Sequence, residues 1–209
     1  MDVKQFEDKR WSGMDQPAEF RHRTAAGLIE GGSVLDLGCG DGLLFRLLGK
    51  KIEKGVGLDI SPEAVRKAKE KGFDARLHSF DDPLPFEDNT FDYVVLLDVL
   101  EHVYDPVPLL REAARVSKNS VIVGVPNFSS LPARLQTLVG RVPENNRPNK
   151  GHIYWFNYHV LGRVARTAGV KPTDIRMNTF SPASVFGDAL VRLFPNLLAL
   201  SFVGEFTKQ

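Results

Sequence analysis

Between residues 33 and 126, short apolar runs alternate with amphipathic segments, and this alternation constrains the fold more than any other feature of the chain. The pattern predicts strands over residues 33–37, 55–60, 74–78, 92–97 and 120–125, separated by helices over residues 43–48, 61–71 and 105–117. Strands that alternate with helices form a parallel sheet through right-handed crossovers. The almost continuous apolar character of residues 92–97 indicates a strand covered on both faces.

Two of these helices carry clear boundary signals. Ser61 can cap the helix over residues 61–71, Pro62 suits its first turn, and Gly72 can end it. The pair Asp105 and Pro106 repeats the combination of cap and proline at the start of the next helix. These residues fix the helix starts more sharply than the apolar pattern does.

The flanking segments extend the same architecture. We expect helices over residues 17–29, 131–139, 158–168 and 183–193, and strands over residues 173–178 and 198–206. Residues 127–160 differ from the rest because they are rich in proline, asparagine and arginine. With no linker or repeat, the sequence predicts a single domain over residues 1–209 with a variable segment at about 127–160.

The composition limits the environments and partners of the chain. Its 27 basic and 26 acidic residues give a formal net charge of +1, which offers no bulk attraction to nucleic acid or anionic membrane. Cys39, the single cysteine, can form neither an internal disulfide nor a cysteine-based zinc site. The charged N-terminus lacks the apolar core of a signal peptide, and no apolar run reaches the length of a membrane span. We therefore expect a cytoplasmic protein with no metal site.

The sequence VLDLGCGDG over residues 34–42 joins a predicted strand to a predicted helix through three glycines. The fingerprint GxGxxG of dinucleotide-binding proteins requires glycine at position 43, but this chain has Leu43 there. Asp36 precedes the glycines, and a carboxylate in that place suits an ammonium group and repels a diphosphate. The motif therefore favours S-adenosylmethionine, which is cationic, over a nicotinamide dinucleotide and its oxidoreductase chemistry.

Asp59 ends the second predicted strand, 19 residues after Gly40. An acidic residue in this place can accept both hydroxyl groups of a ribose. The interaction serves NAD and S-adenosylmethionine equally, so Asp59 gains its discriminating value only in combination with Asp36.

Together with GLDIS and PLPFEDNTFDYVVLLDVLEHV, the glycine motif resembles the class I S-adenosylmethionine-dependent methyltransferases over residues 33–126. The resemblance implies a Rossmann-like fold, with a seven-stranded, mostly parallel sheet of order 3-2-1-4-5-7-6 and helices on both faces. It also implies S-adenosylmethionine as cofactor and a small molecule or a protein as methyl acceptor. The implied cofactor-binding residues are Asp36, Gly38, Cys39, Gly40, Asp59, Ile60, Phe80, Asp81 and Asp98.

Each implied residue has a place in the family's binding pattern. The glycine loop holds the methionine moiety, Asp59 and Ile60 meet the ribose side, and the turn over residues 79–81 meets the adenine. Ser79 stands where relatives often carry aspartate, and Asp81 could substitute for it. Asp98, after the fourth core strand, falls near the methionine end.

Residues 125–143 and the following GHIYWF are similar to the MetW family of methionine-biosynthesis proteins, within the methyltransferase type 11 group. This similarity allows an alternative in which the chain keeps the cofactor pocket but regulates an enzyme partner. Methyl transfer itself remains the preferred hypothesis.

Two histidines are candidate catalytic residues, because an oxygen or nitrogen acceptor requires a base near neutral pH. His102 follows the fourth core strand, where it could instead brace a loop, and His152 lies in the variable segment, where it could instead anchor a helix entry. Cys39 is interpreted as a small loop residue rather than a nucleophile.

Further side chains allow two interpretations each. Arginine matches carboxylate and phosphate geometry, so a basic group could bind an anionic acceptor, or it could form a solvated face. This group consists of Arg134, Arg141, Arg147 and Lys150. Phe6 and Trp11 could form a lid over the cofactor.

Overall fold

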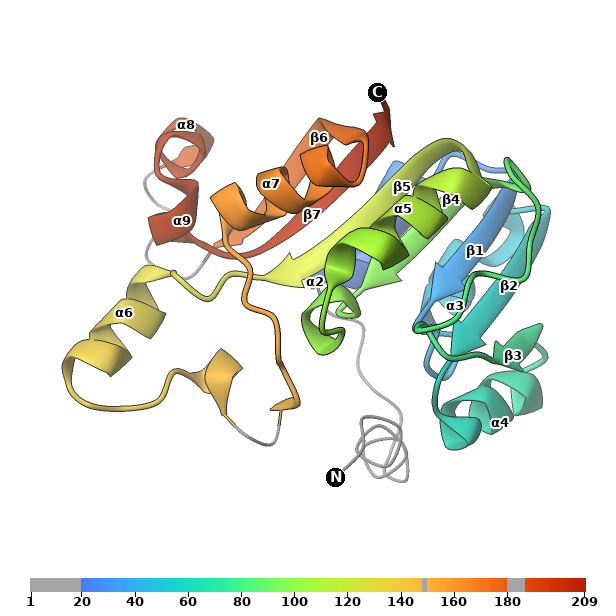
Figure 1. Ribbon diagram of the computed structural model, residues 1–209, viewed down its shortest axis with the longest axis horizontal. Helices are drawn as coiled ribbons and strands as arrows, with labels where there is room; N and C mark the ends of the chain where they lie inside the picture. The colour runs from blue at the N-terminus through green and yellow to red at the C-terminus, as the bar shows by residue number, and fades with distance from the viewer. Residues whose placement is uncertain (1–19, 148–149, 180–186) are drawn as a thin grey trace.

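The computed structural model describes residues 20–147, 150–179 and 187–209, and these residues form a seven-stranded sheet of order β3-β2-β1-β4-β5-β7-β6 (Figure 1). The strands are β1 Ser33–Leu37, β2 Lys54–Asp59, β3 Ala75–Leu77, β4 Phe91–Leu97, β5 Ser117–Pro126, β6 Val170–Thr179 and β7 Ala199–Lys208. The first five run parallel, whereas β7 is antiparallel to both of its neighbours, β5 and β6. The strand order predicted from the resemblance is confirmed.

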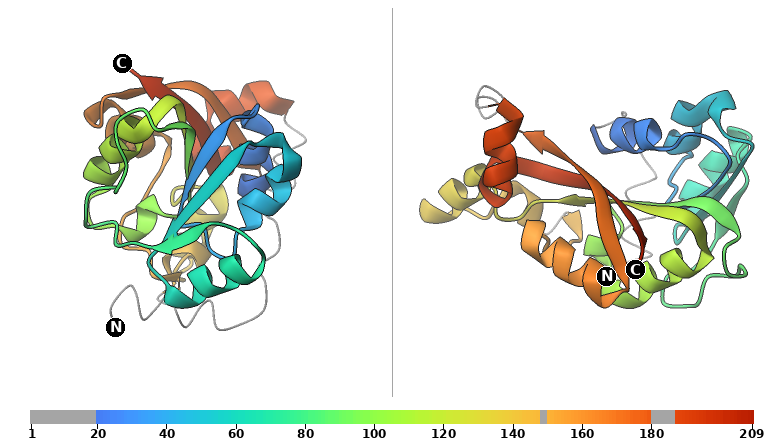
Figure 2. Two further views of the ribbon diagram at one scale, coloured as in Figure 1. Left: turned by 90° about the vertical axis from the view of Figure 1, so that its right-hand side faces the viewer. Right: turned by 90° about the horizontal axis from the view of Figure 1, so that it is seen from above.

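Helices lie on both faces of the sheet (Figure 2). They are α2 Phe20–Leu28, α3 Leu43–Leu48, α4 Pro62–Glu70, α5 Pro106–Val116, α6 Leu131–Leu138, α7 Tyr158–Thr167, α8 Gly187–Leu193 and α9 Pro195–Leu198. Short 3-10 helices, η1 Gly49–Lys51, η2 Leu100–His102 and η3 Glu144–Asn146, complete the described elements. None of the helices in these described ranges has the length and apolarity that a membrane span requires.

The sheet separates two apolar cores. One face packs against α5 and α7, and the other packs against α2, α3 and α4. Successive residues of β1 show the division, because Val34 points into the second core and Leu35 into the first. This alternation follows from the two-residue period of a strand. It explains why the central strands are apolar at nearly every position.

The capping residues identified in the sequence act as predicted. The Ser61 side chain accepts a hydrogen bond from the Ala64 N–H at 3.2 Å, and Asp105 accepts one from the Val107 N–H at 3.0 Å. Pro62 and Pro106 occupy the first turns of their helices. Local chemistry therefore sets where the crossover helices begin.

Several boundaries differ from the sequence prediction. β5 begins at Ser117 rather than residue 120, because Phe91 pairs with Ser117 before the register shifts. β6 begins at Val170 and includes Pro172, which an edge strand tolerates since one side of its backbone has no partner. The predicted helix over residues 183–193 is described only from Gly187, and α9 starts separately at Pro195.

Candidate functional site

The loop after β1 is held in a backbone conformation that glycine adopts readily. Gly38, Gly40 and Gly42 have φ values of 75°, 55° and 83°. A Cβ at Gly38 would lie 2.4 Å from Cγ2 of Val99, and one at Gly42 would lie 2.2 Å from Cδ2 of Phe73. Backbone conformation and close packing therefore both require glycine at the two ends of this loop.

Asp59 connects this loop to the start of α4. Its Oδ2 accepts a hydrogen bond from the Gly40 N–H, and its Oδ1 accepts one from the Ser61 N–H, both at 2.9 Å. The side chain is only 5% exposed. A carboxylate oxygen has a second lone pair, so Asp59 can hold the loop and still accept a ribose hydroxyl. The sequence indicated the ribose interaction but not the attachment of the loop.

Asp36 is a buried carboxylate in β1, immediately before the glycine loop. Burial, followed by repulsion from Asp59, raises the pKa of Asp36 well above its ordinary value. No described residue forms an ion pair with it, although a buried charge normally has a partner. A cationic group of a ligand would supply the missing partner, and the ammonium group of S-adenosylmethionine has the required charge.

Cys39 packs inside the loop. Its Sγ lies so near β2 that a Cβ at Gly57 would come within 2.5 Å of it. Burial raises the pKa of the Cys39 thiol well above its usual value, and neighbouring carboxylates raise it further. The sulfur therefore stays protonated and fills space, in keeping with a small loop residue.

The turn after β3 reaches the same edge of the sheet. His78 donates its backbone N–H to the carbonyl of Asp59 at 2.9 Å, and its ring lies 6.2 Å from that of Phe80. Phe80 is half-buried, whereas Asp81 is exposed and donates its N–H to the Ser79 hydroxyl at 3.4 Å. An aromatic face and an exposed carboxylate thus follow the end of β3.

Asp98 follows β4 with a φ of 57°, a conformation uncommon for a residue with a side chain. Its Oδ2 accepts a hydrogen bond from Arg21 Nε at 2.9 Å and lies 2.7 Å from Arg21 Nη2. The pair is partly buried and joins α2 to the carboxyl end of β4. The described cofactor candidates therefore come from the carboxyl ends of β1, β2, β3 and β4, which are adjacent in the sheet.

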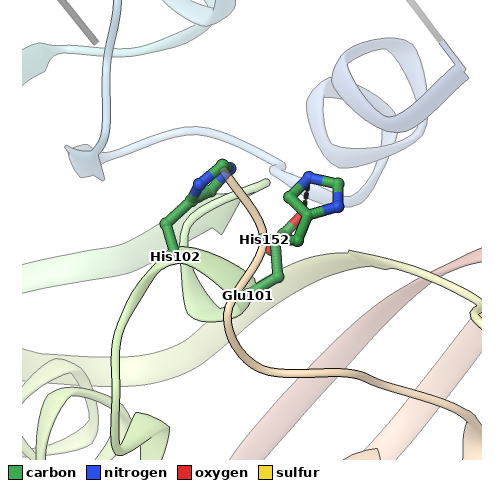
Figure 3. Close-up of side chains that lie close together, drawn as sticks. All are labelled: Glu101, His102 and His152. Carbon is green, nitrogen blue, oxygen red and sulfur yellow. Dashed lines mark ion pairs between the residues drawn. The ribbon is translucent and has the colours of Figure 1, made fainter. Parts of the chain in front are cut away.

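The two candidate catalytic histidines, 50 residues apart in sequence, lie together beside Glu101 (Figure 3). The ring centroids of His102 and His152 are 4.9 Å apart, and His152 Nε2 is 3.9 Å from Glu101 Oε1. The Glu101 carbonyl accepts hydrogen bonds from the N–H groups of Ile153 at 2.9 Å and Tyr154 at 3.0 Å. This backbone pairing holds the segment that carries His152 against η2.

Glu101 is fully buried, and of the adjacent pair Glu101 and His102 the sequence pointed to the histidine alone as a catalytic candidate. Burial, followed by the nearby Asp98 carboxylate, raises the pKa of Glu101 well above its ordinary value, whereas Arg21 lowers it. An acidic residue beside His102 was visible in the sequence. Its proximity to His152 depends on tertiary structure, so the sequence could not show it.

The remaining sequence candidates do not form one described cluster. The four basic side chains of the variable segment are exposed; Arg134 donates to the Ser129 carbonyl and Arg147 pairs with Glu144. Their role as an anion site therefore stays a prediction. The proposed lid residues, Phe6 and Trp11, lie outside the described residues.

Comparison with known proteins agrees with this arrangement. A methyltransferase domain family matches residues 35–123. The ubiquinone biosynthesis O-methyltransferase of Xanthomonas euvesicatoria is 32% identical over 192 residues, which cover 83% of this chain and 80% of that protein. The protein of the same name from Xanthomonas oryzae is 34% identical over 96 residues, but there the match spans only 43% of this chain and 40% of that protein.

Solved structures give the same fold. The magnesium protoporphyrin IX methyltransferase of Synechocystis was solved with bound S-adenosyl-L-homocysteine (SAH). The match has a TM-score of 0.68 at 17% identity and covers 99% of this chain and 98% of that one. A Haloferax volcanii methyltransferase in complex with the activator Trm112 also has a TM-score of 0.68, at 23% identity, covering 99% and 97%. At these identities the likeness supports the fold alone. With the sequence relatives and the glycine-loop geometry, it shows that the chain belongs to the class I S-adenosylmethionine-dependent methyltransferases.

Proposed function

We propose that this chain transfers the methyl group of S-adenosylmethionine to a hydroxyl oxygen of a small-molecule acceptor. The observation that carries the proposal is the buried carboxylate of Asp36, which lacks an ion-pair partner among the described residues and adjoins a glycine loop held by Asp59. The names of the sequence relatives support oxygen as the acceptor atom. A protein acceptor remains the alternative for the substrate.

The proposed pocket follows the carboxyl ends of the four strands. Asp36 faces the ammonium group, the loop from Gly38 through Gly40 meets the methionine moiety, and Asp59 accepts the ribose hydroxyls. The remaining proposed contacts with S-adenosylmethionine come from Cys39, Ile60, Phe80, Asp81 and Asp98. The closely packed glycine loop and the two acidic side chains suit a cationic nucleoside and disfavour a diphosphate.

When bound, the cofactor supplies a methyl group that its positive sulfonium has already activated. Transfer to an acceptor oxygen would break the carbon–sulfur bond and leave its electron pair on sulfur. The protein therefore contributes mainly alignment and exclusion of water. A neutral hydroxyl must also lose its proton, and His102 or His152 could take it, because His102 follows β4 and the ring of His152 lies 4.9 Å from that of His102.

Calorimetry tests the pocket. We expect SAH and S-adenosylmethionine to bind the wild-type chain, NADH to give no signal, and Asp59→Ala to lose at least about tenfold in affinity, in line with one charged hydrogen bond. Glu53→Gln is a matched control, since Glu53 is exposed and precedes the opposite end of β2. Binding of NADH, or equal SAH affinity for Asp59→Ala and wild type, would contradict the proposed pocket.

The alternative is a regulatory partner of an enzyme, and it rests on the similarity of residues 125–156 to the MetW family. In that case the chain would form a stable complex with an acyltransferase and transfer no methyl group to any acceptor in a cell extract. Measuring both properties on one preparation distinguishes the two functions.

A further inference from the structure

Glu101, His102 and His152 bring one carboxylate and two imidazoles together where η2 meets the variable segment (Figure 3). One potential ligand atom from each residue lies within 4.8 Å of the other two. Glu101 and His102 are neighbours after β4, whereas His152 arrives from the segment held by backbone hydrogen bonds to Glu101. The cluster is thus fixed by two separate parts of the fold.

The hydrogen bonds of the two rings determine which nitrogen carries the proton. Nδ1 of His102 lies 3.2 Å from the Gly151 carbonyl, and Nδ1 of His152 lies 2.7 Å from the Asn145 carbonyl. A carbonyl oxygen only accepts hydrogen bonds, so each Nδ1 must donate, and in the neutral ring the lone pair is then on Nε2. Histidines that bind metals show this arrangement, in which the other ring nitrogen donates to a carbonyl or carboxylate.

Two acidic side chains, those of Glu101 and Asp98, lie near one another at this place. Apart from a hydrogen bond between Glu101 and Asp98, which requires that the two carboxyl groups share a proton, neither side-chain oxygen of the fully buried Glu101 has a hydrogen-bond partner among the described residues, and the same holds for Oδ1 of Asp98. Arg21 pairs with the other oxygen of Asp98 and supplies one positive charge for two carboxylates. The 3.9 Å separation between His152 and Glu101 is too long for a hydrogen bond. A bound cation at this place would allow both buried carboxyl groups to ionise.

We propose that Glu101, His102 and His152 bind a divalent transition-metal ion, through one carboxylate oxygen and the two Nε2 atoms. Two imidazoles and a carboxylate form a ligand set suited to Zn²⁺ and related ions, and three protein ligands leave a position open for a further oxygen. Ligand atoms about 2.0–2.2 Å from Zn²⁺ lie about 3.3–3.6 Å apart in a tetrahedron, so these ligand atoms must move closer together by up to about 1.5 Å. The site revises the expectation of no metal, which rested on cysteine content.

The ion would lie after β4, beside Asp98 and hence near the proposed pocket. Its function rests on the proposed O-methylation: the open position would take the acceptor hydroxyl and lower the pKa of that hydroxyl. The proton would pass to solvent water, and the acceptor oxygen would bond to the methyl carbon as the carbon–sulfur bond breaks and leaves its electron pair on sulfur. This function excludes a general-base role for the two histidines, because the same Nε2 lone pairs bind the ion.

The test uses the tag-free, chelator-treated chain of 209 residues, titrated with Zn²⁺ alone. We expect one ion per chain by elemental analysis, a calorimetric binding signal, and a Co²⁺ spectrum typical of nitrogen and oxygen ligands. His102→Ala, His152→Ala and Glu101→Gln should each weaken Zn²⁺ binding by about 100-fold or more, since even the loss of a supporting hydrogen bond costs about 10- to 100-fold. His159→Ala, an exposed histidine of α7, is the matched control and should bind as wild type does.

Titration of SAH into the same samples distinguishes a failure of the proposed metal site from a failure of the proposed methyltransferase function. Variants that still bind SAH are folded, so their loss of Zn²⁺ reports the site directly. If wild type binds SAH but no Zn²⁺, or if the three variants bind Zn²⁺ as His159→Ala does, the metal site is wrong while the cofactor pocket stands. If Zn²⁺ binds and SAH does not, the metal site stands and the proposed function fails.

Discussion

Replacing Gly38 by alanine should destabilise the chain and weaken cofactor binding for two separable reasons. The φ of 75° costs a residue with a side chain about 1–2 kcal/mol. The new Cβ would also lie 2.4 Å from Cγ2 of Val99, and such overpacking costs about 1–3 kcal/mol. We therefore expect Gly38→Ala to lower the free energy of unfolding by about 2–5 kcal/mol.

Gly72 provides the matched control, because its φ is 86° but a Cβ there would meet nothing within 4 Å. Gly72→Ala should therefore cost only the backbone part, about 1–2 kcal/mol. Adding Val99→Ala removes the clashing methyl group, so the double variant with Gly38→Ala should be at least about 1 kcal/mol more stable than the sum of the single changes predicts. Urea unfolding at pH 7 measures wild type and the four variants, with SAH calorimetry in parallel. Equal losses for Gly38→Ala and Gly72→Ala would refute the argument from close packing.

Two further substitutions test how other parts of the fold are held. Asn127 is fully buried and donates from its amide nitrogen to the carbonyl of Ala199 at 2.7 Å. Asn127→Ala should therefore lower the free energy of unfolding in urea by about 1–3 kcal/mol. A decrease below about 0.5 kcal/mol would show that water replaces this hydrogen bond. Hydrogen bonding to Arg115 lowers the pKa of Glu112 below its ordinary 4.5, and Glu112 also accepts the Leu84 N–H at 3.1 Å. A carboxylate whose pKa is lowered in the folded state stabilises the fold at pH values above its unfolded-state pKa. It loses this contribution as the pH falls through its folded-state pKa. The stability gap between wild type and Glu112→Gln should thus be about 1 kcal/mol at pH 7 and shrink below about pH 4.5, and a gap that is constant with pH would exclude this linkage.

Much of the fold followed from the sequence because its signals are local. Alternating apolar runs located the strands, and Ser61 and Asp105 marked helix starts through side chains that cap their own helices. The boundaries that differed depend on partners far away in sequence. Pro172 belongs to β6 only because that strand is at the edge of the sheet, which a local pattern does not reveal.

The candidate site could likewise be predicted from the sequence only where its chemistry depends on residues that are adjacent in the chain. The glycine motif and Asp36 indicated a cationic nucleoside because their chemistry is carried by adjacent residues. The attachment of the loop through Asp59 required knowledge of where the Gly40 and Ser61 N–H groups point. Likewise, nothing in the sequence places His152 against Glu101, since the contact depends on how residues 151–154 cross η2.

Calorimetric titration of SAH into wild type and Asp36→Asn tests the central claim most directly. If a buried carboxylate that meets an ammonium group determines the choice of cofactor, removing the charge of Asp36 while keeping its shape should weaken SAH binding by about 10- to 100-fold. The same substitution should leave the wild-type rejection of NADH intact, because Leu43 still breaks the dinucleotide fingerprint. Equal SAH affinity in both proteins, or NADH binding by wild type, would contradict the account.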